Sequence, residues 1–184
     1  MTVSELLVAI RKPYVETLAR QAAEGAGYVE PAYRNSDGSL AIEGAMAMPC
    51  RVDMIARESA AAGEALQVDA ESELAFEPVG FAIEQMTVLI SPFGWDWLAL
   101  EVRGLSQEAL VQVMGAWFLE WFDVEDENTP TEEGLQGVVH FISDPEPTAE
   151  GFQLKIDLGS APAPAVEDLL FALADGGATG ALLG

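Results

Sequence analysis

The sequence of 184 residues has few cysteines and lacks long apolar runs. Its one cysteine, Cys50, cannot form an intramolecular disulfide, so nothing argues for an oxidising compartment. No stretch approaches the roughly 20 apolar residues of a membrane-spanning helix. The N-terminus lacks the charge order of a secretion signal, because Glu5 comes early and Arg11 and Lys12 follow the short apolar run Leu6–Ile10. We therefore expect a cytoplasmic protein without a membrane partner.

Basic residues are also scarce and unevenly placed. The chain has 8 Lys and Arg against 31 Asp and Glu, for a formal net charge of −23. Residues 1–57 are nearly balanced, whereas residues 58–184 hold only Arg103 and Lys155 as basic residues. Such a surface repels nucleic-acid phosphate and anionic lipid, so we expect no nucleic-acid partner. A basic protein partner is compatible with this charge, and so is a simple role in solubility.

Hydrophobic residues make up 50% of the chain, which is enough to build a folded core despite the high charge. The length suits a single domain over residues 1–184. The alternation of patterns predicts the α+β class: an N-terminal helix, an antiparallel β-meander, and two ββα units that pack their helices on one face of an antiparallel sheet.

The first half of the chain is expected to form one helix and several short strands. Residues 1–27 carry the capping-box spacing of Thr2 and Glu5, followed by apolar residues at helical intervals, and Pro13 should kink or restart this helix. Residues 28–85 form the β-rich meander, in which residues 51–63 are either a strand or a helix. The strands expected there, besides residues 51–57, are Tyr28–Arg34 and Ser39–Met48 around a turn at Asn35–Gly38, then Leu66–Val68, Leu74–Phe76 and Phe81–Ser91.

The second half repeats one pattern of two strands and a helix. Residues 86–123 form the first ββα unit, with strands at 87–90 and 97–102 and a helix at 107–122. An acidic linker at residues 124–136 leads to the second unit at residues 137–175, with strands at 137–143 and 152–158 and a helix at 163–174. Residues 176–184 are a Gly-rich tail that either frays or docks through Leu182 and Leu183.

Candidate catalytic groups are few. The single histidine, His140, lies in a strand that is apolar on both faces, which favours a structural, partly buried side chain over an acid–base catalyst. Ser143 points to the opposite strand face and forms no local triad with it. Cys50 has no second histidine to activate it, and the acidic loop 123–134 lacks the glycine and the final glutamate of a calcium loop. We predict no catalytic, cofactor or metal site.

Aromatic residues give a sharper signal. The helix at 107–122 is apolar around almost its whole circumference, so it must be buried on all sides, either by its own chain or by a second molecule. Trp95 and Trp97 have the opposite strand parity to Leu98 and Leu100 and are expected to point away from the helix layer, where they either form a partner-binding face or are covered by the N-terminal helix or the meander. The candidate interaction surface is Trp95, Trp97, Val111, Trp117, Phe118, Trp121 and Phe122.

The order of helix, strand meander, helix, two strands and helix, together with the acidity, resembles the bacterial type III secretion chaperones. That resemblance implies a small cytoplasmic homodimer whose middle helix, here residues 107–122, packs at the dimer interface. We therefore expect a non-enzymatic, chaperone-like protein that binds a protein client. The alternative is a small-molecule-binding protein or an enzyme with a pocket near His140, Ser143 and Trp97.

Overall fold

The N-terminal helix α1 (Val3–Ala23) begins at the predicted capping box. The Thr2 hydroxyl accepts from the Glu5 N–H, and the Glu5 carboxylate accepts from the Thr2 N–H. The chain then continues as one helix through Pro13, so the proline does not restart it. In this computed structural model, which describes residues 1–25, 27–57 and 63–184, α1 buries Leu7, Tyr14 and Leu18.

The main sheet contains both strands of each predicted ββα unit. Its order is β10 (Glu146–Pro147), β11 (Gly151–Asp157), β8 (Leu98–Arg103), β12 (Gly180–Leu183), β7 (Met86–Ile90) and β6 (Val79–Ile83), with β9 (Phe141–Ile142) paired to β11. All neighbours are antiparallel except β12 and β7, which are parallel. The predicted strand at 137–143 therefore shortens to β9, and the predicted loop 144–150 contains β10.

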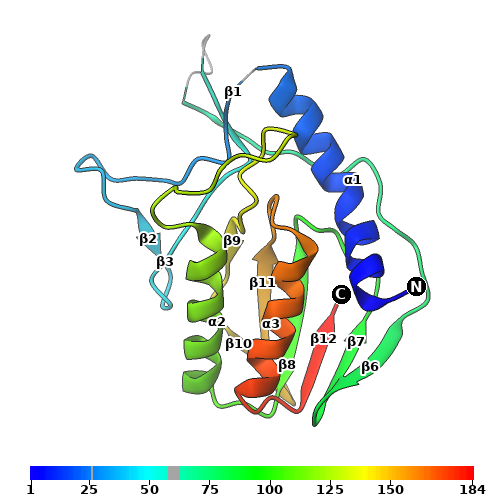
Figure 1. Cartoon of the computed structure of the whole chain (residues 1–184). Helices are drawn as coiled ribbons and strands as arrows, with labels where there is room; N and C mark the ends of the chain where they lie inside the picture. The colour runs from blue at the N-terminus through cyan, green and yellow to red at the C-terminus, as the bar shows by residue number, and fades with distance from the viewer. Residues whose placement is uncertain (26, 58–62) are drawn as a thin grey trace.

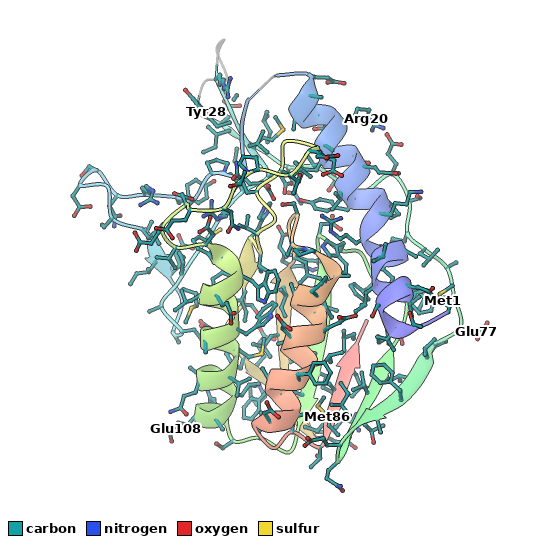
Figure 2. All side chains as sticks on the ribbon, viewed as in Figure 1. Met1, Arg20, Tyr28, Glu77, Met86 and Glu108 are labelled. Carbon is teal, nitrogen blue, oxygen red and sulfur yellow. The ribbon has the colours of Figure 1, made fainter. Side chains whose placement is uncertain are left out.

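The helices α1, α2 (Gln107–Phe122) and α3 (Ala163–Asp175) lie on one face of this sheet, with α3 between the other two (Figure 1). Side chains from the helices and the sheet occupy the gaps between the ribbons in this view (Figure 2). In β8, Leu98, Leu100 and Val102 are buried under the helices, whereas their neighbours on the opposite face are partly exposed. The predicted α+β class, with helices packed on one sheet face, is confirmed. Among the described residues no helix is both long and apolar enough to cross a membrane.

The C-terminal segment is part of the sheet. Residues 180–183 form β12, which is inserted between β7 and β8 and buries Ala181 and Leu183 (Figure 1). The expectation of a tail that frays is wrong, because the short strand satisfies its backbone on both sides. The alternative, docking through the terminal leucines, agrees with the structure for Leu183, which is 1% exposed.

The meander is less regular than expected. β1 (Gly27–Val29) pairs with β4 (Met54–Ala56), and β4 pairs with β5 (Ala65–Leu66). Residues 54–56 are thus a strand, while residues 58–62 of the alternative helix lie outside the described residues. β2 (Ile42–Glu43) pairs with β3 (Met48–Pro49), so the predicted hairpin around Asn35–Gly38 keeps only one bridge, between Arg34 and Leu40.

Two other strand predictions in this region are wrong. Residues 74–76 form no strand. The run Phe81–Ser91 is split into the hairpin β6–β7, because Glu84 adopts a left-handed backbone with φ 50° and turns the chain. The meander lies at the end of the sheet where β11 ends and α3 begins (Figure 1). Tyr28 marks this end of the molecule, and Met86 and Glu108 mark the other (Figure 2).

Candidate functional site: a buried histidine beneath an acidic pocket

The only histidine lies where the meander meets the sheet. His140 immediately precedes β9, and its backbone N–H donates to the Asp157 carbonyl at 2.9 Å. Its carbonyl accepts from the Arg51 N–H, also at 2.9 Å, so the backbone of His140 is bonded to both the sheet and the meander. The side chain is 0% exposed, which corrects the prediction of a partly buried histidine. Burial is complete because Glu30 and Asp53 of the meander and Asp157 and Gly159 of the sheet side surround the ring.

Three carboxylates surround the imidazole. Glu30 follows β1 and places Oε1 2.8 Å from Nε2 of His140. Asp53 precedes β4 and places Oδ1 3.2 Å from Nδ1. Asp157 ends β11 and places Oδ2 3.6 Å from the same Nδ1. Two acids from the meander and one from the sheet therefore meet at one ring.

Each carboxylate is held in place by donors of its own. Glu30 accepts the N–H groups of Gln136 at 2.6 Å and Ser160 at 3.0 Å. Asp53 accepts the Val68 N–H at 2.6 Å and the Tyr14 hydroxyl, so α1 also contributes to the site.

Asp157 accepts the Gly159 N–H at 2.9 Å through Oδ1, which leaves Oδ2 facing the ring of His140. Donors of this kind fix the direction of a carboxylate before any ligand arrives. The acids around His140 are therefore preorganised.

The two ring nitrogens differ in their partners. Nε2 is bonded to Glu30, whereas Nδ1 has no aligned hydrogen-bond partner among the described residues. The Asp53 oxygen, at 3.2 Å from Nδ1, is not aligned for a hydrogen bond, and the Asp157 oxygen, at 3.6 Å, lies beyond hydrogen-bond distance. Fully buried polar atoms without a hydrogen-bond partner are rare in folded proteins, so Nδ1 of His140 is an unusual atom in this core.

Burial and charge act in opposite directions on these groups. Burial lowers the pKa of His140, but the negative charges of Asp157, Asp53 and Glu30 and the hydrogen bond with Glu30 outweigh it and raise that pKa well above its ordinary value. Burial raises the pKa of Glu30 and of Asp53, yet contacts with His140 bring both below the usual range. The surrounding carboxylates therefore favour the charged form of the ring.

A cavity of about 400 Å³ opens beside this cluster. Its wall consists of Cys50, Arg51, Val52, Asp53, Ala65, Leu66, Gln67, Val68, Asp96, Trp97, Phe141 and Asp157. His140 is not part of the wall and lies beneath Asp53 and Asp157. Trp97 is 52% exposed and stacks on Phe141, and burial raises the pKa of the Asp96 carboxyl. The wall of the cavity therefore combines two stacked aromatic rings, Trp97 and Phe141, with the carboxylates of Asp53, Asp96 and Asp157.

Two other candidate residues contribute little to this chemistry. Ser143 lies in a separate cavity of about 230 Å³, and its hydroxyl donates to the Asp144 carbonyl. Cys50 lines both cavities, but burial raises the pKa of its thiol, which keeps it in the less nucleophilic protonated form.

The candidate interaction surface is mostly inside the protein. Trp117, Phe118 and Phe122 are at most 3% exposed, and Val111 and Trp121 are partly buried. Packing of α3 against α2 covers much of this helix, and Trp117 Nε1 donates to the Ala165 carbonyl. The chain therefore buries by itself most of the helix face for which a second molecule was the expected cover.

The expectation that Trp95 points away from the helix layer is wrong, because Trp95 is 1% exposed and stacks on Phe93 in the core. Residues 92–97 form the loop before β8, so strand parity does not apply to them. Trp97 is exposed as expected. Partner binding by the exposed part of this surface stays a prediction.

Sequence reasoning missed Glu30, Asp53 and Asp157, which come from three segments far apart in the chain. One signal was present: Asp53 lies between Val52 and Met54, and Asp157 lies between Ile156 and Leu158. An acidic residue flanked by apolar ones in a short strand is a candidate for a buried, partnered charge. Comparison with protein-family models, curated proteins and solved structures found no match to this chain.

Proposed function

We propose that this protein binds a small, positively charged ligand in the acidic pocket above His140. One observation carries the proposal: three carboxylates, those of Asp53, Asp96 and Asp157, line the same cavity of about 400 Å³. Cavities of this size suit small ligands, and convergent polar groups on an otherwise apolar wall set which ligand is accepted.

The charge of the pocket is not compensated from its own wall. Arg51 is the basic residue among the described lining residues, but its guanidinium donates to the carbonyls of Phe122, Glu30 and Asp123 and to the Asp126 carboxylate. Carboxylates in a partly desolvated cavity attract a cation more strongly than the same groups in water. A cationic ligand therefore fits this site better than a neutral or anionic one.

Ligand binding is tested with small amines as probes. Titration calorimetry with putrescine and with tetramethylammonium should give binding of one molecule per chain, and neutral 1,4-butanediol should not bind. Asp96→Asn should weaken amine binding by about tenfold, because one carboxylate of the pocket loses its charge. Glu108→Gln, which removes one carboxylate charge from the exposed surface of α2 at the opposite end of the molecule (Figure 2), is the matched control and should bind as the wild type does. Equal binding of the diol, or no binding of any cation, would contradict the proposal.

A second candidate function is the binding of a protein partner at the outer face of α2 and α3. A groove of about 390 Å³ runs between these helices, and Phe171 on its wall is 57% exposed. Glu120, Asp168 and Asp175 line the same groove, which favours a basic client over a second, equally acidic copy of this chain.

Light scattering at micromolar concentration tests the partner surface and the predicted homodimer together. A dimer that dissociates in Phe171→Glu supports self-association through this face. A wild-type monomer contradicts the homodimer. The groove would then bind a basic client and not a second copy of the chain.

A further inference from the structure

We infer that Asp53, His140 and Asp157 form a binding site for one divalent transition-metal ion, reached from the acidic pocket. This inference rests on the proposed function, since it names the cation that the pocket takes. The donor atoms are Nδ1 of His140 and one carboxylate oxygen from each aspartate, and all three lie within 4.8 Å of one another.

The distances match those of ligands around an ion. Donors that sit about 2.0–2.2 Å from a zinc ion in a tetrahedral site are roughly 3.4 Å apart. The separations of Nδ1 from Asp53 and from Asp157 are 3.2 Å and 3.6 Å. Asp157 is the partly exposed member of the three, so its side chain has room to adjust as the set closes around an ion.

The orientation of His140 provides an independent observation. Its side chain is fully buried, and Nδ1 faces the two aspartates without an aligned hydrogen bond. Glu30 accepts from Nε2, which selects the tautomer that leaves the Nδ1 lone pair free for a metal. A carboxylate on the far nitrogen of a metal-binding histidine is a recurrent outer partner of such sites, and Glu30 occupies that place here.

Charge favours an ion at the same point. Glu30, Asp53 and Asp157 bring three formal negative charges to a buried volume, and an imidazolium would compensate only one of them. A divalent ion beside a neutral imidazole compensates two. Burying uncompensated charge is costly, so the net negative charge of the cluster favours a divalent cation at this point.

The donor set also limits the choice of metal. One imidazole and two carboxylates suit zinc, manganese or iron(II) better than calcium or magnesium, which prefer sites made of oxygen alone. Asp53 and Asp157 line the cavity, so an ion held by them keeps one or more positions open toward the pocket. Those positions would take water or a donor atom of a second ligand.

The test is a zinc titration of the full chain after removal of metal with EDTA. In buffer with roughly 0.15 M salt, which screens the acidic surface, calorimetry should give one Zn²⁺ per chain. An excess of Mg²⁺ should not displace it. Cobalt(II) in place of zinc should give the visible absorption bands of a low-symmetry N,O site. Asp157→Asn should weaken zinc binding at least tenfold. The oxygen that accepts from the Gly159 N–H is kept, whereas the oxygen that faces Nδ1 is replaced by an amide NH₂ group, which cannot bind a metal ion.

The control is Glu108→Gln, with the same loss of charge on the exposed surface of α2, and it should change the zinc affinity less than threefold. Far-UV circular dichroism verifies that each variant is folded, and His140→Gln provides a second variant of the donor set. Zinc binding that is absent, or equal in the wild type and in folded Asp157→Asn and His140→Gln, overturns the inference. If zinc fails while amines bind in an Asp96-dependent way, the metal site is wrong and the cationic-ligand pocket stands. If neither binds, both proposals fall.

Discussion

Gly159 supports the imidazole of His140 from below. Its φ is +50°, and a Cβ at this position would lie 2.3 Å from Cδ2 of His140 and 2.5 Å from the Val138 carbonyl oxygen. Contact with backbone on one side and a buried ring on the other leaves no direction in which a methyl group is accommodated. Glycine is therefore required both by the backbone conformation and by the position of the ring.

We predict that Gly159→Ala lowers the free energy of unfolding by about 3 kcal/mol, from overpacking added to the strain of a positive φ. Gly134→Ala is the matched control, because Gly134 has φ +79° with no atom within 4 Å of the added Cβ. That variant should lose only about 1 kcal/mol. Urea denaturation of both variants measures the difference. Equal losses would show that the contact with His140 is not what requires the glycine.

The sequence predicts those parts of the site that can be recognised from neighbouring residues in the chain. Thr2 caps α1 as its spacing with Glu5 predicts, and α2 begins at residue 107, where the apolar pattern places its start. His140 was predicted to be structural and only partly buried, because its neighbours are apolar on both strand faces, and the structure buries it completely. Its partners were not predicted, because Glu30 and Asp157 are separated from it by 110 and 17 positions and share no motif with it. Only the pairing of strands brings them together.

Elements were predictable where their own sequence decides their conformation. The helix α2 has an apolar period, a Ser106 N-cap and a turn at Asp123, and its predicted bounds are confirmed. β12 has four residues after a run of glycines, and its pairing with β7 and β8 is decided by the rest of the sheet. Short strands of this kind carry little information of their own.

β12 lies in the middle of the sheet, between β8 and β7, and its two faces have different surroundings. Leu183 is 1% exposed under the helices, whereas Leu182 points to the other face and is partly exposed. Leu183→Ala should lower the free energy of unfolding by about 3 kcal/mol, since it leaves a cavity in the core. Leu182→Ala, with the same change of side chain in the same strand, should cost about 1 kcal/mol. Chemical denaturation measures both, and similar losses would mean that β12 does not separate a core face from an open face.

One buried cation, Arg51, bonds the meander to the helical layer. Arg51 donates to the carbonyls of Phe122 at 3.0 Å and Asp123 at 2.9 Å, at the end of α2. Asp126 completes the contact, because it accepts from Arg51 at 2.6 Å and from Arg34 at 2.7 Å. In a chain of net charge −23, two of the six arginines, Arg34 and Arg51, lie where the meander and the helical layer meet.

This attachment predicts a pH dependence of stability. Burial raises the pKa of Asp126, but hydrogen bonds from Arg51 and Arg34 outweigh it and bring the pKa below its ordinary value. A carboxylate with a lowered folded pKa contributes stability above its unfolded pKa, and loses that contribution as the pH falls through the folded value. The contribution of Asp126 should therefore be constant from pH 8 to pH 5 and disappear below about pH 4.

Asp126→Asn isolates this contribution, because asparagine tolerates the left-handed backbone of residue 126, whose φ is 55°. Since the carboxylate is about half exposed, solvent screening limits the expected loss at pH 7 to about 1 kcal/mol. Urea denaturation of both proteins at several pH values should give free energies of unfolding that converge as the pH falls below about 4. A difference that stays constant down to pH 3 would show that the aspartate acts through its shape and not through its charge, and that the arginines hold the meander without it.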